Sequence, residues 1–257
     1  MEITALVENT SADEQIGAQH GLSFFIQACG HNILFDMGQD DLFYKNAQKL
    51  NIDLADVDIA VLSHGHYDHG GGLSTFLEIN KKAKVYLSRY AFEPYYNGEK
   101  YIGLDVTLKD NDRLVFVDDY LELDKGLTLY SCNDKERDFD LGSFGLSVKK
   151  DSVLYPDTFL HEQYLKIDEY GSSVLFSGCS HKGILNIATW FDVGTIIGGF
   201  HFSKLSLDET LKSYADILKS FETKFITCHC TGEKQYEFLT KHMDNLSYIK
   251  ASEHISI

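Results

Sequence analysis

Three histidines and one aspartate lie within six consecutive residues of this chain, at His64, His66, Asp68 and His69. Imidazole nitrogens and carboxylate oxygens are ligands that divalent transition metals prefer. Four donors at this spacing cannot all reach one ion in ideal tetrahedral geometry. A turn at the end of a strand would instead aim His64 and His66 one way, and Asp68 and His69 the other. The spacing therefore predicts two adjacent divalent ions.

The sequence on either side of this run predicts a strand before it and a helix after it. Residues 58–63 are apolar almost without interruption, which is typical of a strand buried on both faces. Three glycines, 70–72, follow the run and let the backbone turn tightly without side chains crowding the ions. Apolar residues at helical spacing then predict a helix over 73–80. The run therefore lies at a strand end, where α/β proteins place their chemistry.

The remaining elements alternate in the same way. Apolar runs predict further strands over 2–7, 22–28, 33–36, 84–87, 173–177, 195–197 and 224–228. Apolar residues at helical spacing predict helices over 40–50, 183–191, 208–221 and 234–243. Residues from about 90 to 170 are rich in Tyr, Asp and Lys, and predict long loops or an inserted hairpin beside strands at 113–117 and 127–131. No low-complexity linker divides the chain, so residues 1–257 are expected to form a single domain.

Composition excludes several classes of protein. The 257 residues are 44% hydrophobic and 24% charged, which is ordinary for a folded globular chain. The formal net charge is −16, and a surface this acidic repels the phosphate backbone of nucleic acids. The chain shows neither a signal peptide nor an apolar run long enough to span a membrane. Its five cysteines are odd in number and form no CxxC pair, which favours reduced thiols and a cytoplasmic location.

The run His64-x-His66-x-Asp68-His69 resembles the H-x-H-x-D-H signature of the metallo-β-lactamase superfamily. Three further segments resemble that superfamily in the expected order: Leu34-Phe35-Asp36-Met37-Gly38, Val174–His181 and Cys228-His229-Cys230-Thr231-Gly232. The resemblance implies a four-layer αββα sandwich with an insertion around residues 90–170. Within the superfamily, the segments around Cys179, His201 and His229 look like the branch of dihydropterin ribofuranosyl-aminobenzene phosphate synthase-like proteins.

The resemblance also implies a ligand set. His64 and His66 would hold the first ion, and Asp68, His69 and His229 the second. The third ligand of the first ion is either His181 or His161, and the strand-end context favours His181. Cys179 stands where the superfamily has a bridging aspartate, and is either a thiolate ligand or a small packing residue.

Four further interpretations concern residues near these segments. The resemblance places Asp36 behind the metal loop, in support of the ligands. His201 also follows an apolar strand, and is either a substrate contact or proton donor, or an ordinary histidine. Strand alternation would turn Cys228 and Cys230 away from His229, toward the core. His20, His31, His242 and His254 have no comparable context and are interpreted as surface residues.

The implied activity is that of a metal-dependent hydrolase, in which a metal-bound hydroxide attacks a small ester, phosphodiester, lactone or amide. Asp68 would orient the attacking water as well as ligate. A histidine at position 66, where the flavo-diiron branch has glutamate, favours zinc, with manganese or iron as alternatives. The expected partner is a small-molecule substrate, with no nucleic acid and no membrane. The alternative is a non-catalytic ligand-binding or regulatory protein that uses the same pocket.

Overall fold

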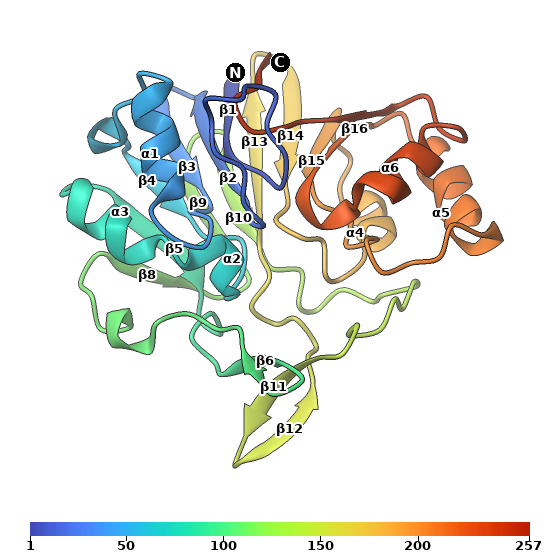
Figure 1. The fold of residues 1–257 in the computed structure, drawn as a ribbon, viewed down its shortest axis with the longest axis horizontal. Helices are drawn as coiled ribbons and strands as arrows, with labels where there is room; N and C mark the ends of the chain where they lie inside the picture. The colour runs from blue at the N-terminus through green and yellow to red at the C-terminus, as the bar shows by residue number, and fades with distance from the viewer.

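The structure, a computed structural model that describes residues 1–257, is built around two seven-stranded sheets packed face to face (Figure 1). The first sheet has the order β18 (His254–Ser256), β1 (Glu2–Val7), β2 (Ser23–Ala28), β3 (His31–Phe35), β4 (Ile59–Val61), β5 (Lys84–Ser88) and β8 (Leu114–Val117). The second has the order β17 (Leu246–Tyr248), β16 (Lys224–Thr227), β15 (Thr195–Gly198), β14 (Ser172–Phe176), β13 (Tyr164–Glu169), β10 (Leu127–Tyr130) and β9 (Tyr120–Asp124).

Helices cover the outer face of each sheet, so that the molecule has four layers (Figure 1). On the first sheet lie α1 (Leu42–Lys49) and α3 (Leu73–Ile79), and on the second α4 (Ile184–Trp190), α5 (Glu209–Lys219) and α6 (Glu233–Leu239). A single-turn helix, α2 (Tyr67–Gly70), carries the second half of the run His64–His69, hereafter the metal run. The predicted four-layer αββα sandwich is confirmed. No helix combines the length and the apolar character that a membrane crossing requires.

Three apolar clusters fill the spaces between the four layers, and alternation along the strands sorts residues among them. In β3, Ile33 and Phe35 face the cluster between the sheets, whereas Leu34 faces α1 and α3. In β14, Phe176 faces the same central cluster and Leu175 faces α4 and α5. Because both faces of each sheet are buried, the strands appear in the sequence as continuous apolar runs.

The central cluster also fixes the two sheets relative to each other beside the site. Phe35 ends β3 and Phe176 ends β14, and their ring centroids lie 5.7 Å apart. Both side chains are fully buried, and burying a side chain of this size contributes about 2–3 kcal/mol. The residues that follow these two phenylalanines enter the site. Packing between the sheets therefore sets the distance between the residues that follow β3 and those that follow β14.

The segment at 90–170 is more regular than a loop insertion. It supplies β8, β9, β10 and β13 to the main sheets, and also a four-stranded sheet with the order β12 (Val153–Pro156), β11 (Leu146–Lys150), β6 (Tyr95–Asn97) and β7 (Lys100–Tyr101). A small apolar cluster, with Tyr95 and Phe159 in it, packs this sheet against Tyr67 of the metal run. The insertion thus exists, but it is a small sheet that lies beside the site (Figure 1).

Candidate metal centre

The site is assembled at the carboxyl ends of strands from both sheets. Within the first sheet β3, β4 and β5 run parallel, and within the second β14, β15 and β16 do so. Parallel strands bring their carboxyl ends to one edge. The residues that follow these strands are Asp36 after β3, His64 after β4, Cys179 and His181 after β14, His201 after β15 and His229 after β16.

Four of the residues at these strand ends have a left-handed backbone. The φ angles are 60° for Asp36, 55° for Ser180, 56° for His201 and 50° for His229. Non-glycine residues avoid this region, and each costs on the order of 1–3 kcal/mol. Such a cost persists only where the surrounding structure fixes the backbone. At these four positions the left-handed residue turns the chain as it leaves the strand and enters the site.

The first group of candidate ligands is His64, His66 and His181. The Nε2 atoms of His64 and His181 lie 3.3 Å apart. The ring centroid of His66 lies 4.6 Å from that of His64 and 5.0 Å from that of His181. His66 Nε2 and His181 Nδ1 are buried and have no hydrogen-bond partner. An imidazole nitrogen in this condition is costly unless something else binds it.

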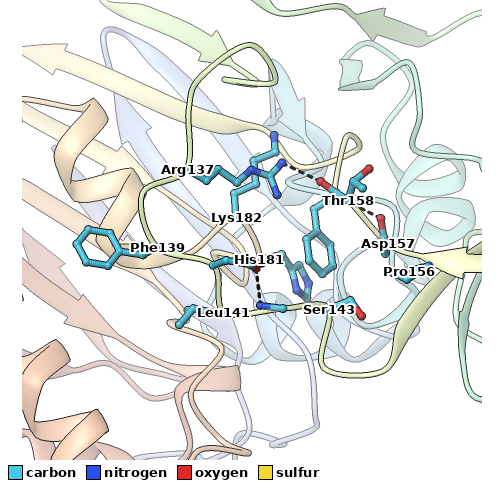
Figure 2. Close-up of a pocket in the computed structure, with 12 residues that line it drawn as sticks. Arg137, Phe139, Leu141, Ser143, Pro156, Asp157, Thr158, His181 and Lys182 are labelled. Atoms are coloured by element: carbon cyan, nitrogen blue, oxygen red, sulfur yellow. Dashed lines mark hydrogen bonds between the residues drawn. The ribbon is translucent and has the colours of Figure 1, made fainter.

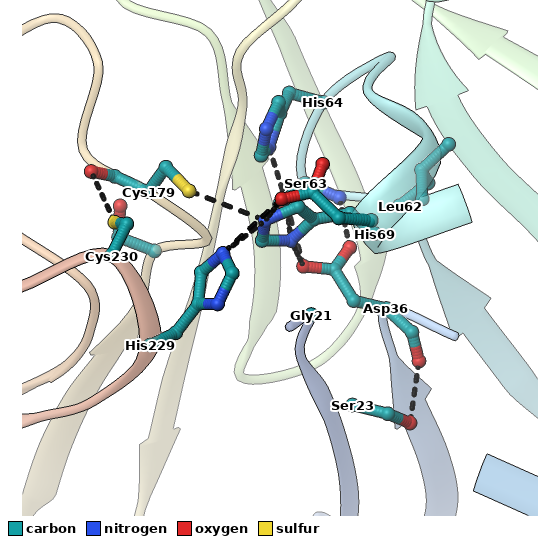
Figure 3. Close-up of polar contacts among 12 residues, drawn as sticks. Gly21, Ser23, Asp36, Leu62, Ser63, His64, His69, Cys179, His229 and Cys230 are labelled. Atoms are coloured by element: carbon teal, nitrogen blue, oxygen red, sulfur yellow. Dashed lines mark hydrogen bonds and ion pairs between the residues drawn. The ribbon is translucent and has the colours of Figure 1, made fainter. Parts of the chain in front are cut away.

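The second group is His69, His229, Asp68 and Cys179, seen in part in Figure 3. His69 Nε2 lies 3.3 Å from His229 Nε2 and 3.2 Å from Cys179 Sγ. Asp68 Oδ2 lies 3.4 Å from His229 Nε2 and 3.8 Å from His69 Nε2. A tetrahedral ion with bonds of about 2.0–2.3 Å separates its ligand atoms by roughly 3.3–3.8 Å. The distances among His69, His229 and Asp68, and the distance from His69 to Cys179, fall close to this range.

Cys179 belongs to both groups. Its Sγ lies within 4.8 Å of the donor nitrogens of His64 and His181, and likewise of His69 and His229. The thiol thus occupies the space between the two groups. The sequence left open whether this cysteine was a ligand or a packing residue. Its position between the groups supports a ligand role.

Three candidate ligands, His64, His69 and His229, each have a hydrogen-bond partner at Nδ1 that fixes the tautomer of the ring. Asp36 Oδ2 accepts from His69 Nδ1 at 2.7 Å and also from Ser63 Oγ at 2.7 Å (Figure 3). That hydroxyl in turn accepts from His64 Nδ1 at 2.9 Å. Asn9 Oδ1 accepts from His229 Nδ1 at 2.8 Å. With the Nδ1 protons committed in this way, Nε2 is the nitrogen of each ring that remains for a metal to bind.

The residues therefore fit a pair of cations. Two Nε2 lone pairs that face each other at 3.3 Å repel unless a proton or a cation lies between them. This occurs twice, at His64 with His181 and at His69 with His229. Imidazole, thiolate and carboxylate donors form the set that zinc prefers.

Burial and neighbouring charges set the protonation of the site. Burial holds the pKa of His64 and His181 well below the usual value, and together with the charge on His161 it lowers the pKa of His66 to about 3. Burial also lowers the pKa of His69, but the negative charges of Asp36 and Asp68 outweigh this effect and raise the pKa to about 9. The first group is thus neutral near pH 7, whereas His69 holds a proton until a metal displaces it.

His161 has a different environment from His181. Its Nδ1 accepts from the backbone N–H of Gly65 at 2.8 Å, and its Nε2 donates to Asp157 at 3.0 Å. The ring stacks on Tyr95 with centroids 3.9 Å apart. Both nitrogens are occupied, so His161 supports the turn between His64 and His66. Gly65 is required there because a Cβ would lie 2.1 Å from Ala91 O.

Cys230 does not face away from the site, contrary to the expectation from strand alternation. β16 ends at Thr227, and the chain then turns through the left-handed residue His229. Alternation ends with the strand, so Cys230 Sγ turns inward and donates to Cys179 O at 3.4 Å. Its Sγ also lies within 4.8 Å of Cys179 Sγ and of a ring nitrogen of His201. Cys228 does pack in the central cluster as predicted.

His20 lies on the surface as predicted, but it is not remote from the site. Its side chain is 55% exposed, yet Nε2 lies 3.2 Å from Asp68 Oδ2. Its ring centroid lies 4.7 Å from that of His229. His201 lies at the cavity as expected, with its ring 4.4 Å from that of His181 and its Nδ1 buried without a partner.

Glu8 and Asn9, which follow β1, also support the site and were not identified from the sequence. Glu8 is fully buried, and its Oε1 accepts from the backbone N–H of His229 at 2.6 Å and from Tyr248 at 2.7 Å. No motif marks these residues. The only signal was their position directly after an apolar strand, which is the signal that located the histidines.

Two cavities border His181. A cavity of about 170 Å³, hereafter the metal pocket, is lined by residues of both ligand groups and by His201. A second cavity of about 380 Å³ lies between the chain around Arg137 and the segment at Asp157–Phe159 (Figure 2). There, Arg137 donates to Thr158 O at 2.8 Å, and Lys182 Nζ donates to two backbone carbonyls.

Four layers with two histidine-rich groups of candidate metal ligands at the strand ends define an α/β protein with a candidate metal centre. Comparison with known proteins names the family. The sequence profile of the metallo-beta-lactamase superfamily matches residues 16–219, and the chain belongs to that superfamily.

Individual relatives span nearly the whole chain. The chain is 31% identical over 255 residues to an uncharacterized protein of Methanocaldococcus jannaschii, with 96% of each covered. It is 31% identical over 244 residues to a protein of the same organism named 7,8-dihydropterin-6-methyl-4-(beta-D-ribofuranosyl)-aminobenzene-5'-phosphate synthase, covering 84% of this chain and 82% of that one. A crystal structure described as a metal-dependent hydrolase of the beta-lactamase superfamily superposes with a TM-score of 0.86 at 29% identity, covering 100% of this chain and 99% of that one.

Proposed function

We propose that this protein is a metal-dependent hydrolase with two divalent ions in its metal pocket. His64, His66 and His181 hold the first ion, and Asp68, His69 and His229 hold the second. Cys179 contributes its thiolate between them, where the superfamily has an aspartate. The donor set favours zinc, with manganese or iron as alternatives.

One observation carries this proposal. Pairs of imidazole Nε2 atoms face each other at 3.3 Å in both groups, while second partners hold the Nδ1 protons of His64, His69 and His229. A solvated histidine loop would have no reason to fix these tautomers. The arrangement is what a preformed site for two cations requires.

The chain's own residues supply binding, orientation and proton transfer. Bound divalent ions polarise the substrate and lower the pKa of water. Asp68 lies between His20 and His229 and orients the attacking water with its free oxygen. His201 Nδ1 has no partner in the protein, so it is free to hold a proton for the leaving group. The bond broken belongs to a small ester, phosphodiester, lactone or amide.

Elemental analysis followed by a turnover screen tests the proposal. Protein purified without added metal, and then loaded with zinc, manganese or iron, is expected to bind two ions per chain and to hydrolyse chromogenic esters or phosphodiesters. Asp68→Asn should lose turnover and the second ion, whereas substitution of the remote surface residue His242 should change neither. Two bound ions without turnover of any class would refute the hydrolase and favour the ligand-binding alternative.

A group transfer at the same site is a second candidate function. The observation that favours it is the relative named as a synthase, which shares 31% identity over most of the chain. In such a reaction, an acceptor other than water would attack the substrate held at the ions. Turnover that requires an added nucleophilic acceptor, and does not occur in water alone, would distinguish a transferase from a hydrolase.

We also propose a cytoplasmic location and a small-molecule substrate. All five cysteines are free thiols, and a thiolate ligand at Cys179 requires a reducing environment. The net charge of −16 opposes binding to nucleic acid.

A further inference from the structure

The metal pocket differs from the rest of the molecule in its charge. The chain has 39 acidic residues and 23 lysines and arginines. Among the 15 residues that line the metal pocket, however, two are lysines, and Asp68, a candidate ligand, is the only acidic residue. By contrast, the cavity of Figure 2 balances Arg137 and Lys182 with two aspartates. A cationic rim on an acidic protein focuses anions toward this one opening.

Lys100 is held directly over the metal run. It lies in β7 of the small sheet, and its Nζ donates to the hydroxyl of Tyr67 at 3.2 Å. The same Nζ lies 4.6 Å from the centroid of the Tyr67 ring. Tyr67 stands between His66 and Asp68 in the sequence, so the Lys100 ammonium group contacts the loop that carries the candidate ligands.

Lys204 reaches the pocket from a different part of the chain, the loop after β15. Its Nζ donates to Phe144 O at 3.1 Å, and the Phe144 ring packs against His201 with centroids 4.9 Å apart. Phe144 therefore connects Lys204 to His201, the candidate proton donor.

Neither lysine is neutralised by the protein. Lys45 in α1 and Lys166 in β13 pair with carboxylates within 4.0 Å, but Lys100 and Lys204 do not. Each has bonds only to uncharged oxygens and keeps further N–H donors for a ligand. Both ammonium groups line the same opening, so each is available to a negatively charged group that enters it.

We propose that Lys100 and Lys204 form a subsite for a negatively charged group of the substrate, a phosphate or a carboxylate, at the mouth of the metal pocket. This inference rests on the proposed function, because it places the reacting bond at the metal ions. Lysine acts as a point charge and does not impose the bidentate geometry that arginine would, so the subsite selects charge more than shape.

The size of the pocket limits what enters. A volume of about 170 Å³ corresponds to roughly six water molecules at about 30 Å³ each. It admits the reacting group and a few neighbouring atoms. The anionic group then lies at the rim, where the lysines are exposed, and the rest of the substrate extends into solvent. The substrate class is therefore an anionic ester, phosphoester or amide whose reacting group is small enough to enter the pocket.

Equilibrium binding of inorganic phosphate tests the subsite without turnover. Metal-loaded protein is titrated calorimetrically as wild type, Lys100→Gln, Lys204→Gln and the double variant, after elemental analysis shows equal metal content. Each substitution is expected to raise Kd by up to about fivefold, the upper end of the effect of losing an exposed charge contact. Lys100→Arg should retain affinity. Lys212→Gln, which removes the same charge from α5, should match wild type. A double variant with wild-type affinity would overturn the proposal.

A matched pair of substrates separates the subsite from the hydrolase. Mono-p-nitrophenyl succinate carries a distal carboxylate, and p-nitrophenyl butyrate does not. The double variant should lower the ratio of kcat/KM for the charged over the neutral ester by up to about 25-fold, mainly through KM, if two fivefold effects add. An unchanged ratio argues against a carboxylate at the subsite, and with unchanged phosphate binding it refutes the subsite. If the wild type hydrolyses neither ester nor any other compound of the turnover screen, the proposed function fails, while phosphate titration still decides whether the lysines bind anions.

Discussion

The Nε2 atoms of His69 and His229 face each other at 3.3 Å, although the two residues are 160 positions apart in the chain. His69 donates its other proton to Asp36, and His229 donates its own to Asn9. The charges on Asp36 and Asp68 outweigh burial and raise the pKa of His69 to about 9, so without a metal the proton on His69 Nε2 lies between two basic nitrogens. A divalent ion would replace that proton, so metal binding and proton release must be linked.

This linkage predicts that affinity for the second ion rises with pH. Below about pH 9 the ion displaces one proton from His69, so affinity should increase roughly tenfold per pH unit between pH 6.5 and 8.5. Burial raises the pKa of Cys179 as well, so a ligating thiolate would release a second proton and steepen the dependence. The first group is neutral in this range and should bind its ion with little pH dependence.

Competition with a chelating dye at several pH values measures this slope. Calorimetry in buffers of different ionisation enthalpy counts the protons directly. Cys179→Ser should reduce the total number of protons released on metal binding by one. Equal, pH-independent affinities for both ions would contradict the assignment of His69.

The ligand Asp68 and the supporting residue Asp36 should differ in their effects on metal content. Asp68→Ala is expected to remove the second ion and abolish turnover, because its carboxylate lies within 3.8 Å of both His69 and His229. Asp36→Ala should weaken metal binding by roughly 10–100-fold without removing a ligand, since Asp36 orients His69 and Ser63. Elemental analysis at two free-metal concentrations separates the two. If both variants kept wild-type metal content, the loop would not be the site.

Much of this site was predictable from the sequence, because each main ligand directly follows an apolar strand. Strand ends in α/β proteins converge at one edge, so His64, His181, His201 and His229 were placed together before their contacts were known. The continuous apolar runs likewise indicated sheets buried on both faces. In both cases the local sequence was sufficient, because the order of apolar and polar residues along a strand reflects which of its faces are buried and where the strand ends.

The residues that were missed depend on contacts no local pattern encodes. Glu8 reaches the backbone of His229 across 221 positions, and His20 meets Asp68 from an exposed loop. Cys230 was misplaced because the strand was extended past Thr227, where a left-handed turn reverses its direction. β9 (Tyr120–Asp124) was missed because it is an edge strand with three exposed residues and only partly buried apolar ones.

The contrast between His181 and His161 yields a further prediction. His181→Ala should lower the metal content from two ions toward one, because His181 Nε2 faces that of His64. His161→Ala should retain both ions but lose roughly 1–3 kcal/mol of stability, because the buried N–H of Gly65 loses its acceptor. Metal analysis and thermal unfolding of the two variants give opposite patterns. Loss of the first ion only in His161→Ala would mean that His161 is the third ligand.

The last prediction concerns oxidation of the pair Cys179 and Cys230, whose Sγ atoms lie within 4.8 Å of each other. Hydrogen peroxide takes two electrons and two protons from the two thiols, which leaves one disulfide and two water molecules. A disulfide would withdraw the Cys179 thiolate from both ligand groups, so oxidised protein should lose metal and turnover, and dithiothreitol with added zinc should restore them. Intact mass should fall by about 2 Da, and peptide mapping should link the two cysteines. Cys230→Ser should bind both ions and should not show the reversible loss of metal and turnover on oxidation. Cys228 is a buried neighbour that faces the central cluster, so Cys228→Ser should behave as wild type. Retention of metal and activity after the disulfide has formed would show that Cys179 is not a ligand.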